Sequence, residues 1–234
     1  MRFMYTGPSW AASSFPEGGS ATNLARQWAI PHINFALSAS NVLKCIEKVK
    51  SHTLLPVVWI YHEPLGCLTE STGLSYTELL RRSDWKDIRE DCNQFCLQQI
   101  ANLNRPVLLI GGHSDIINCE HSNIVIGHKS WQKFLAEKAQ IQIDNNQVCV
   151  KMDDGGDFLF ENCWGAEIMH RIMHENPSID PSAEITSAIW DIFFFWKQLE
   201  KANLFYEVHP NLQGNKLFAA ETKQTVINFL EDIK

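Results

Sequence analysis

No apolar run in this chain reaches the ~18–20 residues that a helix needs to cross a bilayer, so the sequence predicts no membrane partner. Clusters of Lys and Arg are also missing, and the net charge of the 234 residues is −7. Binding to nucleic-acid phosphates needs such clusters, so we expect no nucleic-acid partner. We also expect no secretory leader, because Gly7 and Pro8 interrupt the few apolar residues that follow Arg2. We therefore expect a cytoplasmic protein.

Cysteine is present in an odd number without a secretory leader: Cys45, Cys67, Cys92, Cys96, Cys119, Cys149 and Cys163. This argues against a disulfide framework and for reduced, mostly buried thiols. Two short patterns contain metal-binding residue types, namely Glu167, His170 and His174, and His113, Cys119 and His121. Neither matches a common zinc motif, and a solvated helix face is the simpler interpretation of the first. We expect no metal and no cofactor.

Strand-like apolar runs alternate with helical patterns along the chain. The expected strands are Arg2–Thr6, His32–Leu37, Leu54–Tyr61, Pro106–Ile110 and Asn123–Ile126. The expected helices are Ser20–Ala29, Asn41–Lys50, Asp84–Leu103, a short one from Ser130, Pro181–Ala202 and Gln213–Ile233. The continuous run LLPVVWIY at Leu54–Tyr61 is typical of a parallel strand buried on both faces. We predict an α/β fold, a three-layer α/β/α sandwich with a mainly parallel, flavodoxin-like sheet.

The chain contains no linker long enough to divide it, so we expect one domain over residues 1–234. The pattern is least regular in the middle, and we expect an insertion around residues 118–162. Within it, Asp144–Asn146 reads as a polar turn and Asp153–Phe158 as an acidic, glycine-containing loop.

Two residues near opposite ends of the chain suggest nucleophilic chemistry. Ser9 lies on the turn after the first expected strand, and His209 precedes the final helix. A serine hydroxyl becomes a useful nucleophile when a histidine takes its proton. The plainer interpretations are a turn serine that caps the next segment and a loop histidine. Ligands of parallel α/β sheets bind at the carboxyl ends of the strands, where Ser9 and the candidate residues that follow the second, third and fourth strands would lie.

These residues and their flanking motifs resemble the SGNH (GDSL-like) hydrolase superfamily over most of the chain. The matching segments are Gly7-Pro8-Ser9 for the nucleophile block, Asn34–Asn41 for the block that carries an oxyanion-binding glycine, Ile60–Glu63 for the block with an oxyanion-binding asparagine, and His209–Gly214 (HPNLQG) for the base block. The last fits best. Departures are Pro8 for Asp, Ser38 for Gly, His62 for Asn, and Tyr206 for the Asp before the histidine.

The resemblance implies roles for the matching residues. Ser9 would be the nucleophile and His209 the general base. The oxyanion or substrate would be held by four residues, Ser38, Asn41, His62 and Glu63. An alternative at the fourth strand, Gly111–Asp115, resembles the asparagine block superficially, but chain order favours Ile60–Glu63. Because Tyr206 replaces the usual carboxylate, Glu207, Asp115 or a backbone carbonyl would have to orient the imidazole.

The implied activity is hydrolysis of an ester or of an acetylated small molecule or glycan by a serine esterase or deacetylase. Two alternatives remain open: a degenerate SGNH fold that binds a ligand without turnover, and an acyltransferase on the same scaffold. Aromatic residues crowd the expected helix at 189–199, where they wrap too much of the helix for one buried stripe. Three interpretations of this segment stay open. It could be a helix packed between the sheet and another element, an interface between copies of the chain, or an apolar wall for an acyl group.

Overall fold

The computed structural model describes residues 2–12, 24–37, 41–52, 54–61, 64–74, 82, 84–112, 116, 119–140, 142–144, 147–151, 157–161, 199–206 and 209–233. Five parallel strands form the central sheet: β1 (Phe3–Thr6), β2 (His32–Asn34), β3 (Val57–Tyr61), β4 (Val107–Gly111) and β5 (Ile124–His128). Their spatial order is β2-β1-β3-β4-β5, and every neighbouring pair is parallel. This is the flavodoxin-like order. The predicted fold class is confirmed.

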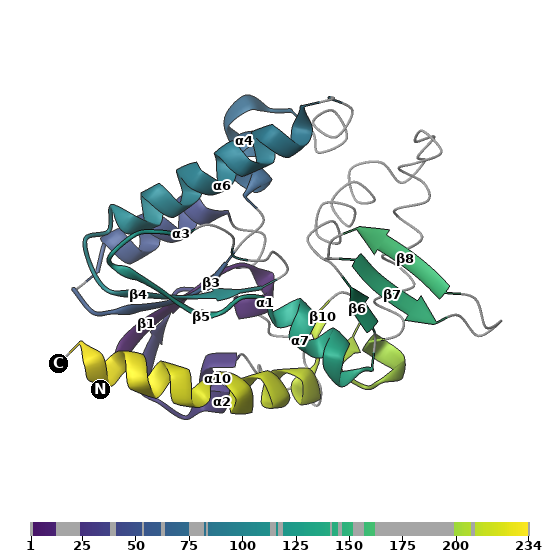
Figure 1. Cartoon of the computed structure of the whole chain (residues 1–234). Coiled ribbons are helices and arrows are strands. Elements are labelled where there is room, and N and C mark those ends of the chain that lie inside the picture. Colours follow the sequence, from purple (N-terminus) through teal and green to yellow (C-terminus); the bar gives the residue numbers. More distant parts are fainter. Residues whose placement is uncertain are drawn as a thin grey trace.

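Helices cover both faces of the sheet (Figure 1). One face packs against α2 (Leu24–Trp28), α7 (Trp131–Lys138) and α10 (Leu212–Asp232). The other packs against α3 (Val42–Lys50), α4 (Leu65–Thr72) and α6 (Trp85–Ala101). The two layers enclose two separate clusters of buried side chains, one on each side of the sheet.

Strand β3 shows why the chain forms this sandwich. Val58 and Ile60 belong to the cluster on the α10 side, whereas Trp59 and Tyr61 belong to the cluster on the α6 side. Successive side chains of a strand point to opposite faces, so an uninterrupted apolar run requires cover on both. All five residues of β3 are buried. Each large side chain removed from water contributes about 1.5–3 kcal/mol, which favours the three-layer arrangement.

The remaining elements in the described part of the chain are short. They are the helix α1 (Ser9–Ala12), the strands β6 (Gln142–Asp144), β7 (Gln147–Lys151) and β8 (Asp157–Glu161), and the strands β9 (Phe205–Tyr206) and β10 (His209–Pro210). Strands β6, β7 and β8 form a separate antiparallel sheet, and β9 pairs with β10. The range 118–162 thus contains β5 of the main sheet as well as the whole small sheet.

Several expected boundaries differ from the structure. The strand expected at His32–Leu37 ends at Asn34, whose side-chain oxygen accepts a hydrogen bond from the Ala36 backbone N–H. Strand β8 begins at Asp157, inside the expected loop Asp153–Phe158, because Asp157 pairs with Lys151. Most of the helix expected at Pro181–Ala202 lies outside the described residues.

Helix starts agree better with expectation. Asn41 caps α3, and its side-chain oxygen accepts a hydrogen bond from the Lys44 backbone. Ser130 caps α7 in the same way through Lys133. Among the described residues, no helix combines the length and apolar character that crossing a membrane requires.

Candidate functional site

The turn after β1 places Ser9 at the start of a helix. Helix α1 begins at Ser9, and the backbone N–H groups of Ala11 and Ala12 both donate to the Pro8 carbonyl at 2.9 Å. Gly7 has a φ of 149°, and a Cβ there would lie 2.8 Å from the backbone oxygen of Ile60. Glycine therefore lets this turn lie directly against β3. The expected strand-to-helix turn is present, with the backbone of Ser9 at the carboxyl end of β1.

The chain after β2 continues towards this turn. The Phe35 N–H donates to the Tyr5 carbonyl at 2.7 Å, and the Leu37 N–H donates to the Gly7 carbonyl at 3.1 Å. Through these two hydrogen bonds, the residues that follow β2 stay alongside β1 and the turn after it. Ser38, the expected oxyanion donor, comes next in sequence but lies outside the described residues.

Asn41 has a structural role that the sequence analysis did not separate from ligand binding. It is 7% exposed, caps α3 through its side-chain oxygen at 3.0 Å from the Lys44 nitrogen, and donates through its amide to Glu70 on α4. Lys44 and Glu70 form an ion pair at 2.7 Å. These contacts join the start of α3 to α4. A contribution of Asn41 to oxyanion binding stays a prediction.

Other expected site residues fall in segments outside the described residues. These are His62 and Glu63 after β3, and the possible orienting acids Asp115 and Glu207. The metal-like pattern at Glu167, His170 and His174 falls outside as well, as does His113. Within the described ranges, no three His, Cys, Asp or Glu side chains gather closely enough to hold a metal ion.

His209 begins β10 and lies opposite Tyr206 of β9 in the antiparallel pair. It is half-buried, and its Nδ1 atom is buried. Cα atoms of β10 lie within 8 Å of Cα atoms of α1. The element that begins with Ser9 and the element that begins with His209 are therefore neighbours, although they come from opposite ends of the chain.

The residues after His209 explain much of the HPNLQG pattern in physical terms. The Asn211 side-chain oxygen accepts a hydrogen bond from the Gly214 backbone at 2.9 Å and caps α10, and the Asn211 N–H donates to the Leu204 carbonyl at 3.0 Å. A Cβ on Gly214 would lie 2.3 Å from that same carbonyl oxygen, so only glycine allows this approach. Asn211 and Gly214 therefore hold the chain that follows His209.

Asn215 was missed by the sequence analysis. Its amide donates to the carbonyls of Pro210 and Asn211 at 3.0 and 2.9 Å, and the residue is 1% exposed. It thus fixes the backbone immediately after His209 from inside α10. An asparagine one turn into a helix carries no sequence signal, because its bonding partners become known only when the preceding strand is placed.

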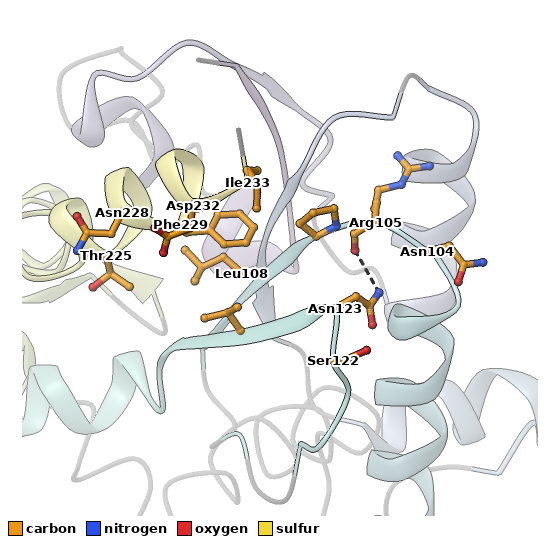
Figure 2. Close-up of a pocket in the computed structure, with 12 residues that line it drawn as sticks. Asn104, Arg105, Leu108, Ser122, Asn123, Thr225, Asn228, Phe229, Asp232 and Ile233 are labelled. Carbon is orange, nitrogen blue, oxygen red and sulfur yellow. Dashed lines mark hydrogen bonds between the residues drawn. The ribbon is translucent and has the colours of Figure 1, made fainter.

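A described pocket lies at the opposite end of the sheet (Figure 2). Its volume is about 530 Å³, and it lies between the last turns of α10 and the amino ends of β4 and β5. Leu108 and Phe229 form part of its apolar wall, and Asn123 donates to the Arg105 carbonyl beside it at 3.1 Å. None of the expected site residues lines it. The pocket is therefore separate from the edge that carries Ser9 and His209.

Two of the expected residues, Ser9 and His209, belong to neighbouring elements, and Asn41 caps the helix that follows β2. Comparison with protein-family models, curated proteins and solved structures found no match. Functional inference for this chain therefore depends on its own residues and on the arrangement of these elements.

Proposed function

We propose that the protein is an SGNH-like serine hydrolase that cleaves an ester or an acetylated small molecule or glycan. Ser9 attacks the carbonyl carbon, and His209 accepts the serine proton and returns it to the leaving group. The N–H groups of Ser9 and Ser38, together with the ring of His62, stabilise the oxyanion. Asn41 and Glu63 lie at the edge of the substrate. This mechanism requires neither a cofactor nor a metal ion.

The observation that carries the proposal is the contact between α1 and β10. The first residue of α1 is Ser9, and the first residue of β10 is His209. Nucleophilic catalysis needs these two side chains within hydrogen-bond reach, and neighbouring backbones are the precondition. Both elements lie beside the carboxyl ends of parallel strands, where ligands of such sheets bind.

The expected rate depends on how His209 is oriented. The family carries an aspartate three residues before the histidine; Tyr206 stands at that position here and is in register with His209. Without a carboxylate to orient the imidazole, the rate of acyl transfer falls about 10⁴-fold. Glu207 or Asp115 would restore part of it. Losing one of the oxyanion donors would lower the rate by roughly a further 10²–10³-fold. The missing carboxylate by itself therefore predicts a slow enzyme with a measurable serine-dependent rate.

Hydrolysis of a panel of short-chain chromogenic acyl esters tests the proposal. The wild type should show saturable turnover that falls to the background rate in both Ser9→Ala and His209→Ala. Ser51→Ala and His121→Gln serve as matched controls, because both residues are outside the candidate site and should keep the wild-type rate. Equal rates in the wild type and Ser9→Ala would refute the assignment of the nucleophile.

Tyr206 also favours a second candidate, a protein of the same fold that binds a ligand without turning it over. Tyr206 stands at the motif position where the family carries an aspartate, and the Asn41 side chain caps α3. This candidate predicts a small molecule retained on purification and no serine-dependent hydrolysis. Native mass spectrometry of the purified wild type, compared with the denatured protein, distinguishes it from the enzyme.

A further inference from the structure

Two thiols touch in the layer formed by α3, α4 and α6. Cys67 of α4 and Cys96 of α6 lie with their Sγ atoms 3.4 Å apart, and the Cys96 thiol donates to Cys67. Neither cysteine is in a disulfide, and both are buried, with 5% and 0% of their surfaces exposed. The two helices pack closely, with Cα atoms within 8 Å of each other. The sulfurs therefore need to approach by little more than 1 Å to reach the ~2.05 Å of a disulfide.

The surroundings of Cys67 favour its thiolate form. The hydrogen bond from Cys96 is the largest influence on the pKa of the Cys67 thiol and lowers it. Burial raises this pKa, the backbone N–H groups of Leu43 and Val42 lower it, and the charge of Glu70 raises it. The net pKa of Cys67 lies below the ordinary value of a thiol. Leu43 and Val42 form the first turn of α3, where helix N–H groups point outwards. The thiolate is the form that reacts with oxidants.

We propose that Cys67 and Cys96 form a redox couple that closes to a disulfide when the protein meets a hydroperoxide. The inference is independent of the proposed hydrolase activity, because it rests on the contact between the two thiols. In the first step the Cys67 thiolate attacks one peroxide oxygen, the O–O bond breaks, and the products are the Cys67 sulfenic acid and hydroxide (or an alkoxide). In the second, the Cys96 sulfur displaces the sulfenic oxygen, which leaves as water, and the S–S bond forms.

The disulfide would join α6 to α4, the helix that contacts Asn41, one of the expected site residues. Helix α4 follows the segment with His62 and Glu63, and its Glu70 binds Lys44 and Asn41 at the start of α3. Oxidation therefore removes the freedom of α4 to move relative to α6 while leaving its contacts to α3 in place. A thiol pair with this placement couples the redox state of the solution to the rigidity of that layer.

The test is peptide mapping of the full chain. The reduced protein is exposed to hydrogen peroxide in modest excess, denatured with an alkylating reagent, and digested without reductant. We expect a peptide pair linked through Cys67 and Cys96, with both thiols lost together. In Cys96→Ser the reaction should stop at the Cys67 sulfenic acid, which dimedone traps, whereas Cys67→Ser should leave Cys96 alkylatable.

Cys92→Ser is the matched control, since Cys92 lies one turn before Cys96 on α6 and is half-buried. This variant should still form the Cys67–Cys96 link at the wild-type rate. The proposal is overturned if Cys92 and Cys119 are oxidised while Cys67 and Cys96 both remain alkylatable. A map without any oxidised cysteine, or one in which Cys67 is linked to a different cysteine, overturns it equally. The wild-type map alone decides the matter if a serine variant does not fold.

Discussion

The substitution Gly214→Ala should affect the free energy of unfolding in two opposite ways, through helix propensity and through packing. Gly214 lies inside α10, where alanine is favoured over glycine by about 1 kcal/mol. An added Cβ, however, would lie 2.3 Å from the Leu204 carbonyl oxygen, and this is backbone, so no side-chain rotation relieves the contact. Overpacking of this kind costs about 1–3 kcal/mol. Moving Leu204 also weakens the bond that its carbonyl accepts from the Asn211 N–H at 3.0 Å, which is worth about 1 kcal/mol.

The balance is a net loss of about 2 kcal/mol in the free energy of unfolding, or roughly 4–8 °C in Tm for a chain of this size. Urea denaturation and thermal melting followed by far-UV circular dichroism measure both quantities. Gln213→Ala is the control, because Gln213 is exposed on the same helix turn and its replacement should change stability by less than about 0.5 kcal/mol. A Gly214→Ala protein as stable as the wild type, or more stable, would refute the reasoning.

Three further outcomes follow from the described contacts. Asn211→Ala should lower the free energy of unfolding by about 1–2 kcal/mol in urea denaturation, whereas Asn211→Asp, which keeps the capping oxygen, should lose much less. Tyr61→Phe removes a buried 2.6 Å hydrogen bond to Asn93 and should cost about 1 kcal/mol in the same assay, and a neutral result would contradict the contact. Arg82 holds the pKa of Asp84 below its ordinary value through hydrogen bonding, so Arg82→Ala should raise that pKa in an NMR titration; an unchanged midpoint would exclude the pair in solution.

The central sheet was predictable because its signal is local. The apolar run before Tyr61 and the one at Pro106–Ile110 are continuous, and only a strand covered on both faces explains them. The helices expected from Asn41 and from Ser130 are present, and these two residues are their N-terminal caps. Alternation of these elements along the chain was enough to predict the sandwich.

Features that depend on distant partners were missed. Helix α4 was not expected, because its sequence LGCLTEST has an early glycine and little polar periodicity, and it is held by packing against α3 and α6. The contact between Cys67 and Cys96 joins two helices and has no signature in the spacing of the cysteines. Nothing local in either segment predicts the proximity of α1 and β10, which we expected only through the resemblance to a family.

The most direct measurement of the central claim is the intact mass of the protein after exposure to a fluorophosphonate, with Ser9→Ala treated in parallel. Such reagents phosphonylate a serine readily when a neighbouring base removes its proton, and the Ser9→Ala protein reports any adduct formed elsewhere. An activated Ser9 predicts one adduct on the wild type and none on the folded Ser9→Ala protein. No adduct on the folded wild type at neutral pH, or an equal adduct on both proteins, would contradict the assignment of Ser9 as the nucleophile.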